Sequence, residues 1–403
     1  MRWLTFFPRI ENVHLTKDVG LVAKYAMEHG YRAVLAGRFT EEEYPALQAE
    51  ARGLETVDLP ETNRPKPTWP WFRYLDGDFV RLLRKDAAHI DILHLFHLSR
   101  DTIAYGVLYK KLNPKGKLYV KLDAYNEHFL YRKKYSKNVW KDRVLKRIEK
   151  SFIKRVDLLS IENKSGLELA KRTYPELSGR LVYLPNGAND VYIDTHFKRG
   201  DVEKENIFLS VGRPGSPDKN YELLLRALPL IRWEDWRMVI VGDCTPDFVL
   251  ARDAFFRQHP EIRDKVEFTG AITDRKKLYD LYARSKVFFL PSLKESFGIS
   301  FAEALYFGCA LVGHDGMSAY ADLSEEGKFG TYYISDDEYA LARGLHEAAK
   351  MSSRQGFVDE VFKHAESHFS WSRIATQLIA KLNAERGAPR DSAPSVTDKH
   401  RGS

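Results

Sequence analysis

Short apolar runs alternate with amphipathic stretches along most of the chain. In the first half the apolar runs cover residues 90–96, 117–123 and 156–162, and each has the length of one buried strand. Buried strands that alternate with helices are typical of a parallel sheet covered by helices on both faces. The first half is therefore predicted to be one doubly wound α/β unit.

A second series of the same kind follows. Its apolar runs cover residues 206–213, 236–243, 265–270, 286–292 and 309–316. The polar stretch 194–206 has no apolar period, and we interpret it as the linker between two units. The predicted fold class is α/β, with two Rossmann-like, doubly wound parallel-sheet domains.

These patterns set the expected domain boundaries. We place the first domain at 1–190, the second at 191–365, and a C-terminal helix that could cross back to the first domain at 366–385. Residues 386–403 lack any apolar run, and we expect them to be disordered. The 403 residues, 44% of them hydrophobic, suffice for two separate cores.

Several signals of location and chemistry are missing from the sequence. No run of about 18 apolar residues occurs, and residues 1–10 are too short and too soon polar for a signal peptide, so we expect a cytoplasmic protein. Cys244 and Cys309 have neither disulfide nor zinc spacing, and both are expected to be reduced. Asp76 and Asp78 form a D-x-D pattern that we interpret as a turn, so no metal site is predicted.

The net charge of +7 indicates an anionic partner: nucleic acid, a membrane surface or a phosphorylated small molecule. Residues 131–155 hold 11 Lys or Arg against 2 acidic residues, and Trp140, Val144, Ile148 and Phe152 recur there every four residues. Either this stripe packs in the domain core, or the cationic face of the helix lies on anionic lipid. No nucleic-acid-binding motif is present, so nucleic acid is not expected as a partner.

Two glutamates flank a predicted strand-to-helix turn in the second domain. Ligands of open parallel sheets bind outside the carboxyl ends of the strands. Glu295 lies in the loop at such an end and Glu303 lies early in the next helix, so both can face one crevice. The backbone N–H groups of Phe297, Gly298 and Ile299 at the helix start would bind an anion there.

A second loop adds positive charge at the same edge. Arg213 ends the strand 206–213, a loop rich in glycine and proline follows, and Lys219 stands at the entry of the next helix. A planar guanidinium and a mobile ammonium at one loop suit a diphosphate. The loop is not a Walker motif, because GxxxxGK[ST] is absent.

Together these segments resemble a known family. GRPGSPDKN, VIVGD, the PNG of LPNGAND, the E-x7-E pair and the late FSWSRIATQLIAKL are similar to the C-terminal half of the family 4 retaining glycosyltransferases, or glycosyl transferases group 1. The resemblance covers residues 157–383, and the first half matches only in its strand and helix pattern. It implies the GT-B fold, in which two Rossmann-like domains face a central cleft.

The resemblance also implies roles for the donor-site residues. Arg213 and Lys219 would hold the diphosphate of a nucleotide sugar, Glu303 would bind the ribose hydroxyls, and Glu295 would contact the transferred sugar. The base would lie on the loop at Gly270 and Ile272. The donor is then a substrate, UDP-linked rather than GDP-linked, and neither a cofactor nor a metal is expected.

The acceptor side is less like the family. His14 and Lys17 in the first loop could contact the acceptor or the donor phosphates, although capping of the next helix is an equal alternative. Relatives often have a histidine–aspartate pair near the anomeric carbon, and here only Asp123 matches. Asp123, at a strand end, could orient or deprotonate the acceptor hydroxyl, with His128 as its rival.

Two functions follow from this reading. One is a retaining glycosyltransferase that extends a glycan or lipid-linked acceptor in cell-surface polysaccharide or glycoconjugate synthesis, with peripheral contact to the inner face of the membrane through residues 131–155. The other is a nucleotide-sugar-binding subunit with weak catalysis that regulates or scaffolds a partner enzyme. The missing histidine favours the second function, and the complete set of donor residues favours the first.

Overall fold

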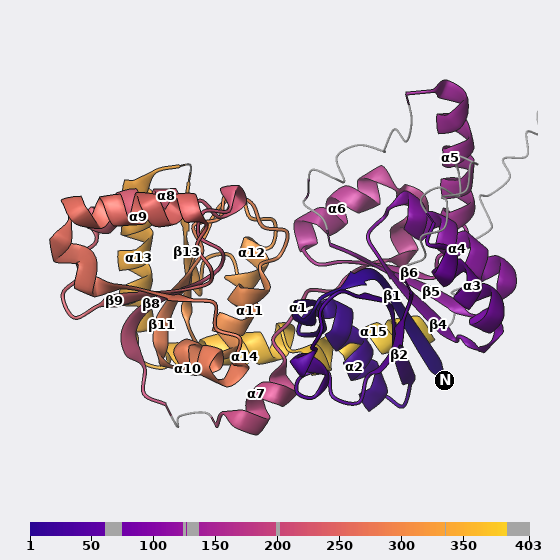
Figure 1. Ribbon diagram of the computed structural model, residues 1–403, viewed down its shortest axis with the longest axis horizontal. Coiled ribbons are helices and arrows are strands. Elements are labelled where there is room, and N and C mark those ends of the chain that lie inside the picture. The colour runs from indigo at the N-terminus through magenta and orange to yellow at the C-terminus, as the bar shows by residue number, and fades with distance from the viewer. Residues whose placement is uncertain (61–74, 124–125, 127–136, 199–201, 335, 385–403) are drawn as a thin grey trace, which may run out of the picture.

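The computed structural model describes residues 1–60, 75–123, 126, 137–198, 202–334 and 336–384. Two parallel sheets form two domains that lie side by side, with helices on the faces of each sheet (Figure 1). The α/β class with two doubly wound domains, predicted from the alternation of apolar runs, is confirmed.

The first sheet has seven strands in the order β3-β2-β1-β4-β5-β6-β7, and the second has six in the order β10-β9-β8-β11-β12-β13. The strands of the first sheet are β1 (Arg2–Ile10), β2 (Arg32–Phe39), β3 (Glu55–Asp58), β4 (Ile92–Phe96), β5 (Lys117–Leu122), β6 (Leu158–Ile161) and β7 (Leu181–Tyr183). Those of the second are β8 (Glu205–Val211), β9 (Arg237–Val241), β10 (Val266–Gly270), β11 (Ser285–Phe289), β12 (Ala310–His314) and β13 (Gly330–Tyr333).

The helices of the first domain are α1 (Asn12–Leu15), α2 (Asp18–Glu28), α3 (Gly77–Asp86), α4 (Arg100–Leu112), α5 (Val139–Ile153) and α6 (Lys164–Thr173), and α7 (Asp190–His196) leads out of it. Those of the second are α8 (Tyr221–Ala227), α9 (Pro246–Gln258), α10 (Arg275–Arg284), α11 (Ile299–Tyr306), α12 (Tyr320–Leu323), α13 (Glu338–Ser352) and α14 (Phe357–His368). The last helix is α15 (Trp371–Asn383). No helix in the described part of the chain is long and apolar enough to cross a membrane.

The strands expected from apolar runs are all present, and the sequence reading did not single out β1, β2, β3, β7 and β13. β1 is an interior strand of the first sheet, between β2 and β4, and Trp3 and Leu4 in it are fully buried. Its pairing with β2 shifts register between Phe6 and Arg9, around Pro8. A proline fits a strand at such an irregularity because it has no N–H to donate. The charged ends and the proline weakened the strand signal here.

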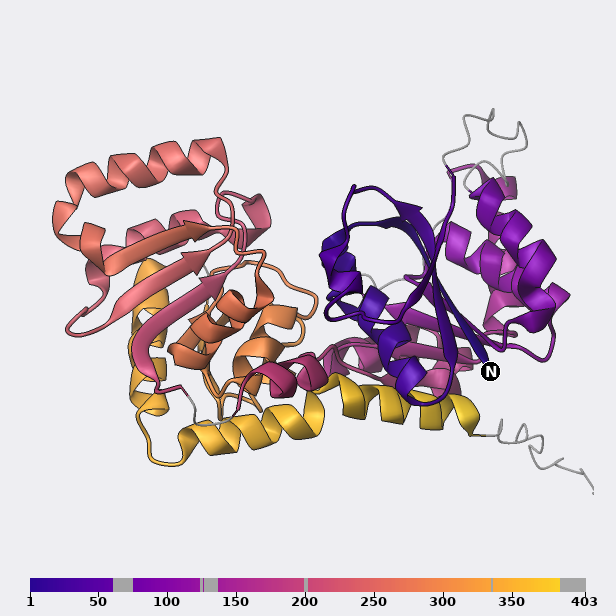
Figure 2. The same ribbon diagram turned by 60° about the horizontal axis from the view of Figure 1, so that its bottom comes forward.

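Helix α15 returns to the first domain. Trp371, Ile374, Leu378 and Leu382 are buried there against α2 and the face of the sheet that carries Trp3. Figure 2 shows α14 and α15 running one after the other beneath both domains. The C-terminal segment therefore belongs to the core of the domain that the chain left at α7.

The two segments that cross between the domains are joined to each other. The N–H of Ala188 donates to the carbonyl of Phe369 at 2.7 Å, and the N–H of Trp371 donates back to Ala188 at 3.1 Å. A Cβ on Gly187 would lie 2.6 Å from the Phe369 carbonyl oxygen, so this close approach needs glycine. The glycine of the PNG motif thus allows the two interdomain segments to pack closely.

The predicted linker can be compared with the structure only in part, and the predicted disordered tail lies outside the described residues. The predicted linker 194–206 was too long, because α7 continues to His196 and β8 begins at Glu205. Residues 199–201 and 386–403 are outside the described part of the chain.

Candidate active site

The two loops expected to hold the donor lie together at the carboxyl edge of the second sheet. β8 and β11 are neighbours, so the loops that follow them are adjacent. The Lys219 ammonium donates to the Glu295 carboxylate, which also accepts from Ser292 Oγ at 3.0 Å. A backbone hydrogen bond of 3.1 Å from Leu293 to Asp218 ties the loops to each other. Lys219 and Glu295 therefore form one charged pair.

Arg213 lies at the start of the same loop, where its side chain is exposed. The tight turn behind it depends on Gly215, whose φ is +89° and where a Cβ would lie 1.9 Å from Thr245 Oγ1. Arg213 is exposed to solvent at the start of the loop that carries Lys219. An incoming anion would meet Arg213 as an exposed cation.

The helix start after Glu295 has the geometry that suits close backbone approach. Gly298 is the N-cap of α11 and has a φ of +80°, and the helix begins at Ile299. The first N–H groups of a helix have no partner within it. Phe297 just before is buried and packs near Phe369, so it holds the turn in place and does not face the cleft.

Glu303 is buried and already surrounded by donors. One oxygen of its carboxylate accepts from Arg275 at 2.5 Å, and the other accepts from Tyr282 Oη at 3.2 Å. Tyr279 Oη also lies 3.3 Å from the carboxylate. The sequence reading gave Glu303 to ribose hydroxyls and did not foresee these three partners. Oε1 accepts from both Arg275 and Tyr279, whereas Oε2 accepts from Tyr282 and has a second lone pair, so a ribose hydroxyl can still be accommodated at Oε2.

Arg275 also connects the two domains. Its Nε lies 3.1 Å from Oε1 of Glu50, a buried residue of the first domain. Burial by itself lowers the pKa of Arg275, but the charge of Glu303 and the neighbouring Tyr279 offset it, and the pKa is raised well above its usual range. Burial raises the pKa of Glu50. The charge bridge from Glu50 through Arg275 to Glu303 spans the interdomain boundary.

The loop expected to carry the base is held from the neighbouring strand. Gly270 ends β10 with a φ of +71°, and the next N–H, that of Ala271, donates to Asp243 at 3.0 Å. Ile272 is partly buried against the core of the second domain. The loop ends at Arg275, so it leads directly to the charge bridge.

Asp123 lies across the cleft at the end of β5. Its carboxylate hydrogen-bonds with Glu162 and with Ser296, the residue after Glu295. Surrounding protein by itself would raise the pKa of Asp123, but these hydrogen bonds and the charges of Lys121 and His97 lower it below its usual value. The structure thus brings Asp123 of the first domain to the glutamate loop of the second.

His97 is a site residue that the sequence reading missed. It follows β4, its Nδ1 lies 3.2 Å from the backbone carbonyl oxygen of Asp123, and its side chain is exposed. Because a carbonyl oxygen only accepts, Nδ1 carries the hydrogen. His97 has a φ of +57°, which costs a non-glycine residue about 1–3 kcal/mol and is typical of functional sites. A histidine next to Asp123 therefore comes from the loop after the adjacent strand β4, and the sequence around Asp123 gave no sign of it.

The remaining acceptor candidates have different surroundings. The Glu11 N–H donates to His14 Nδ1 at 3.0 Å, and the His14 ring packs near Phe7, so His14 fixes the start of α1. Burial, and next the charge of Lys17, lower the pKa of His14. Lys17 is the N-cap of α2 and is partly buried. His128 lies outside the described residues.

The acidic patterns considered for metal have structural partners. Asp76 Oδ1 accepts from the N–H groups of Asp78 and Phe79 and thereby caps α3. Asp76 also pairs with Arg38 at 2.5 Å. Among the described residues, no group of three or more His, Cys, Asp or Glu is arranged to hold a metal ion.

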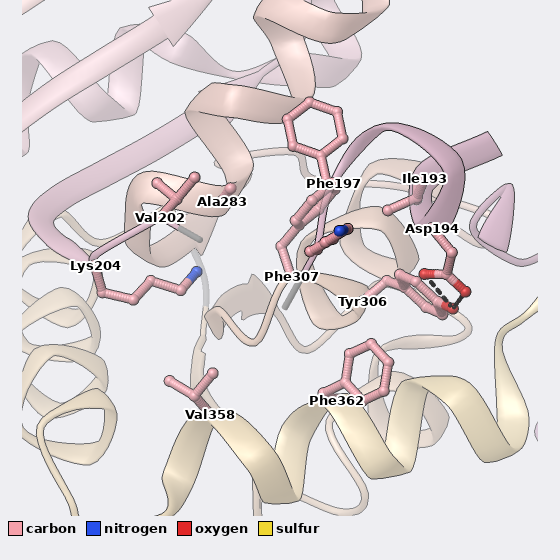
Figure 3. A pocket seen from close by; sticks show the side chains of 11 residues that line it. Ile193, Asp194, Phe197, Val202, Lys204, Ala283, Tyr306, Phe307, Val358 and Phe362 are labelled. Carbon is pink, nitrogen blue, oxygen red and sulfur yellow. Dashed lines mark hydrogen bonds between the residues drawn. The ribbon is translucent and has the colours of Figure 1, made fainter. Parts of the chain in front are cut away.

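A separate cavity of about 320 Å³ lies at the linker, between α7, α10, α11 and α14 (Figure 3). Its lining is mostly apolar and includes Phe197, Phe307 and Phe362, and none of the site residues above belongs to it. Lys204 in its wall donates to the backbone carbonyl of Ser285 at 2.6 Å. The cavity is distinct from the cleft.

Comparison with known proteins relates the second domain to a family. Residues 192–363 match the model of the family described as Glycosyl transferases group 1. The second domain therefore belongs to the glycosyl transferases group 1 family, and the two domains together have the GT-B fold. The expected similarity to the glycosyl transferases group 1 and the expected GT-B fold are confirmed.

Two curated proteins are similar to this chain in sequence, and one solved structure is similar to it in fold. A phosphatidyl-myo-inositol mannosyltransferase of Mycolicibacterium smegmatis is 27% identical over 55% of this chain and 56% of its own length. A lipopolysaccharide core biosynthesis mannosyltransferase of Rhizobium leguminosarum is 27% identical over 43% of this chain and 49% of its own. The chain thus spans about half the length of these curated relatives. The structure of Anabaena HepE in complex with UDP has a TM-score of 0.68 at 14% identity and covers 95% of this chain and 99% of its own.

We predict that the charge bridge contributes strongly to stability. Arg275→Met leaves two buried carboxyls, Glu50 and Glu303, without their cation, so the free energy of unfolding in urea should fall by about 3–5 kcal/mol. Arg237→Met is the matched control, because Arg237 is 38% exposed and pairs with Glu205 at the surface. The control should lose less than about 1 kcal/mol.

A second variant separates charge from packing. Adding Glu303→Gln to Arg275→Met removes one uncompensated carboxylate and should restore part of the lost stability. Equal losses for Arg275→Met and Arg237→Met would contradict the bridge.

Proposed function

We propose that the protein is a retaining glycosyltransferase that moves a sugar from a UDP-linked donor to a hydroxyl of a glycan or lipid-linked acceptor. The observation that carries this proposal is the meeting of Asp123 with Ser296, beside the Lys219–Glu295 pair. A candidate proton acceptor from one domain and a candidate diphosphate site from the other thus share one cleft.

Each part of the site has a task in this reaction. The bond from the anomeric carbon to the diphosphate breaks, and its electrons leave with the diphosphate. Arg213, Lys219 and the N-terminus of α11 stabilise that charge. The acceptor oxygen forms the new bond to carbon, and Asp123 takes the proton from the acceptor hydroxyl. Fixed cations can thus stabilise the leaving group without a metal, and retention is carried over from the family resemblance.

The alternative of a catalytically weak binding subunit loses its main support. It rested on the missing histidine beside Asp123, and His97 reaches that position from β4. We therefore favour an active enzyme. The names of the two mannosyltransferases refer to phosphatidyl-myo-inositol and lipopolysaccharide core, which supports a lipid-linked acceptor and a place in cell-surface glycoconjugate synthesis.

We also propose that α5 contacts the inner, anionic face of a membrane. Ile148 and Phe152 of its apolar stripe pack on the first domain, whereas Trp140 and the adjacent Val139 are 64% and 70% exposed. The N-terminal end of α5 projects from the domain in Figure 1. Exposed cations along the helix are Lys141, Arg143, Lys146, Arg147 and Lys150. Each cation near such a surface contributes about 1 kcal/mol. Residues 131–136 lie outside the described part of the chain.

Calorimetry tests the donor loop. Arg213→Ala and Lys219→Ala should each weaken the binding of UDP by roughly 1.5–3 kcal/mol, because each removes a charged contact to phosphate. The binding of uridine should stay nearly unchanged. Lys219→Ala should cost more than Arg213→Ala, since it also leaves Glu295 unpaired beside the phosphates. Lys328→Ala, an exposed lysine at the opposite end of the second sheet, is the control. Equal losses for UDP and uridine would show that the loop does not touch the phosphates.

Steady-state kinetics tests the enzyme itself. The wild-type chain should hydrolyse or transfer sugar from one member of a UDP-sugar panel, and it should do so in EDTA. Asp123→Asn should lower kcat by about 100-fold or more, in the range of general-base contributions, while UDP affinity stays unchanged. A parallel loss of UDP affinity, or normal turnover, would contradict the role of Asp123. Recovery of EDTA-treated enzyme only by magnesium or manganese would contradict metal independence.

Vesicle cosedimentation tests the membrane contact. The chain should bind phosphatidylglycerol vesicles more than phosphatidylcholine vesicles, and salt should weaken the binding. Trp140→Ala combined with Lys141→Glu and Arg143→Glu should abolish the preference, because the variant removes apolar area and reverses two charges. Lys328→Glu is the matched charge control and should bind like the wild type. If both variants bound phosphatidylglycerol vesicles equally well, α5 would not be part of the membrane contact.

A further inference from the structure

Three carboxyl groups converge on one buried ammonium beneath Asp123. Lys121 in β5 is fully buried, and its Nζ lies 3.5 Å from Asp18 in α2 and 3.7 Å from Glu162. Asp123 follows two positions later, directly after β5; its charge also acts on Lys121, and its carboxyl bonds to Glu162. One positive charge therefore faces three acids.

Glu162 is the most enclosed of the three acids. It follows β6 and is fully buried, and its Oε2 accepts from Asn186 Nδ2 at 2.8 Å. Within the described part of the chain, its other oxygen, Oε1, receives no hydrogen bond, and the Lys121 ammonium makes none. Tyr183 of β7 is a further titratable group that interacts with the charge of Glu162 from a neighbouring element.

The count of charges indicates where a proton resides. A single buried ammonium cannot offset three carboxylates, because like charges at short range disfavour joint ionisation. Two carboxyls that share a hydrogen bond require a proton between them. Burial raises the pKa of Glu162 well above its usual value, and the adjacent Asp123 raises it further, while Lys121 opposes this. The pKa of Asp123 shifts the other way.

We propose that Glu162 is a positioning residue that keeps its proton and donates its O–H to the Asp123 carboxylate. The hydrogen bond holds Asp123 ionised and aimed at Ser296, where the acceptor hydroxyl must approach the donor. Asp123 then accepts the proton that the acceptor loses, and the proton of Glu162 stays in place. This role rests on the proposed function.

The arrangement predicts a loss of activity at high pH. When Glu162 loses its proton, the donor to Asp123 disappears and two carboxylates repel each other. Glutamine is nearly isosteric with a protonated glutamate and keeps an N–H donor, but it cannot ionise. Glu162→Gln should therefore retain most of the turnover and lack the basic limb that the wild-type kcat profile shows.

Glu162→Leu gives the opposite result, because it fills the space without a donor. We expect kcat to fall by roughly 10-fold or more, the size of a lost hydrogen bond to a charged group, with UDP affinity unchanged in calorimetry. The proposal would be overturned if the wild type, Glu162→Gln and Glu162→Leu had similar kcat values and similar losses of kcat at high pH. So would inactivity of Glu162→Gln in a folded protein that still binds UDP, because Glu162 would then be needed as an anion.

Two measurements without turnover separate this proposal from the proposed function. At pH 7, infrared difference spectra of wild type minus Glu162→Gln should contain the C=O band of a protonated carboxylic acid. An ionised carboxylate band instead would overturn the proposal even if the enzyme is active. If the wild type transfers no sugar, a protonated band still supports the shared proton while the glycosyltransferase function fails.

Thermal unfolding is the second measurement. A carboxyl that stays protonated in the fold must take up a proton on folding once the pH exceeds its unfolded pKa, so this stability is lost as pH rises toward the folded pKa. The Tm of Glu162→Gln minus that of the wild type should therefore grow from about pH 5 to pH 8. Glu360→Gln, at the exposed Arg354 pair, should give a constant difference over that range. A constant difference for Glu162→Gln too would show that Glu162 ionises normally.

Discussion

The packing of α15 on the first domain is the constraint on which the site depends. The chain leaves the first domain at α7 and returns at α15, and the two crossings are hydrogen-bonded between Ala188 and Phe369. Trp371 is buried beside α2, so α15 anchors the C-terminal end of the chain on the first domain. The carboxyl edges of the two sheets are thereby held opposite each other, which allows Asp123 to reach Ser296.

The charges of the cleft divide between its two sides. The second domain offers Arg213 and Lys219, and the first offers a set of carboxyls around Lys121. Glu295 pairs with Lys219, so a phosphate that binds Lys219 competes with that carboxylate. The cations of the second domain suit a diphosphate leaving group, and the carboxyls of the first domain suit a group that takes a proton from a hydroxyl. This arrangement fits displacement of a diphosphate by a hydroxyl.

The residues that match family motifs lie in the second domain, whereas the site residues that only the fold revealed lie in the first. The family model matches residues 192–363, where local motifs identified Arg213, Lys219, Glu295 and Glu303. The first domain has no such motifs, and there the sequence pointed to His14, Lys17 and His128 near the cleft. Only the fold showed that His14 fixes α1 and that His97 stands beside Asp123.

The sequence by itself determined the α/β class, the two domains and the residues of each donor loop. These depend on apolar periodicity and on turn residues, which act between positions close in the chain. Tertiary structure decided which loops meet. His97 reaches Asp123 because β4 and β5 are adjacent, and Glu50 reaches Arg275 because α15 draws the domains together. The protonation of Glu162 likewise depends on burial and on charges from β5 and α2. These neighbours are distant in the sequence, so a local sequence pattern cannot predict them.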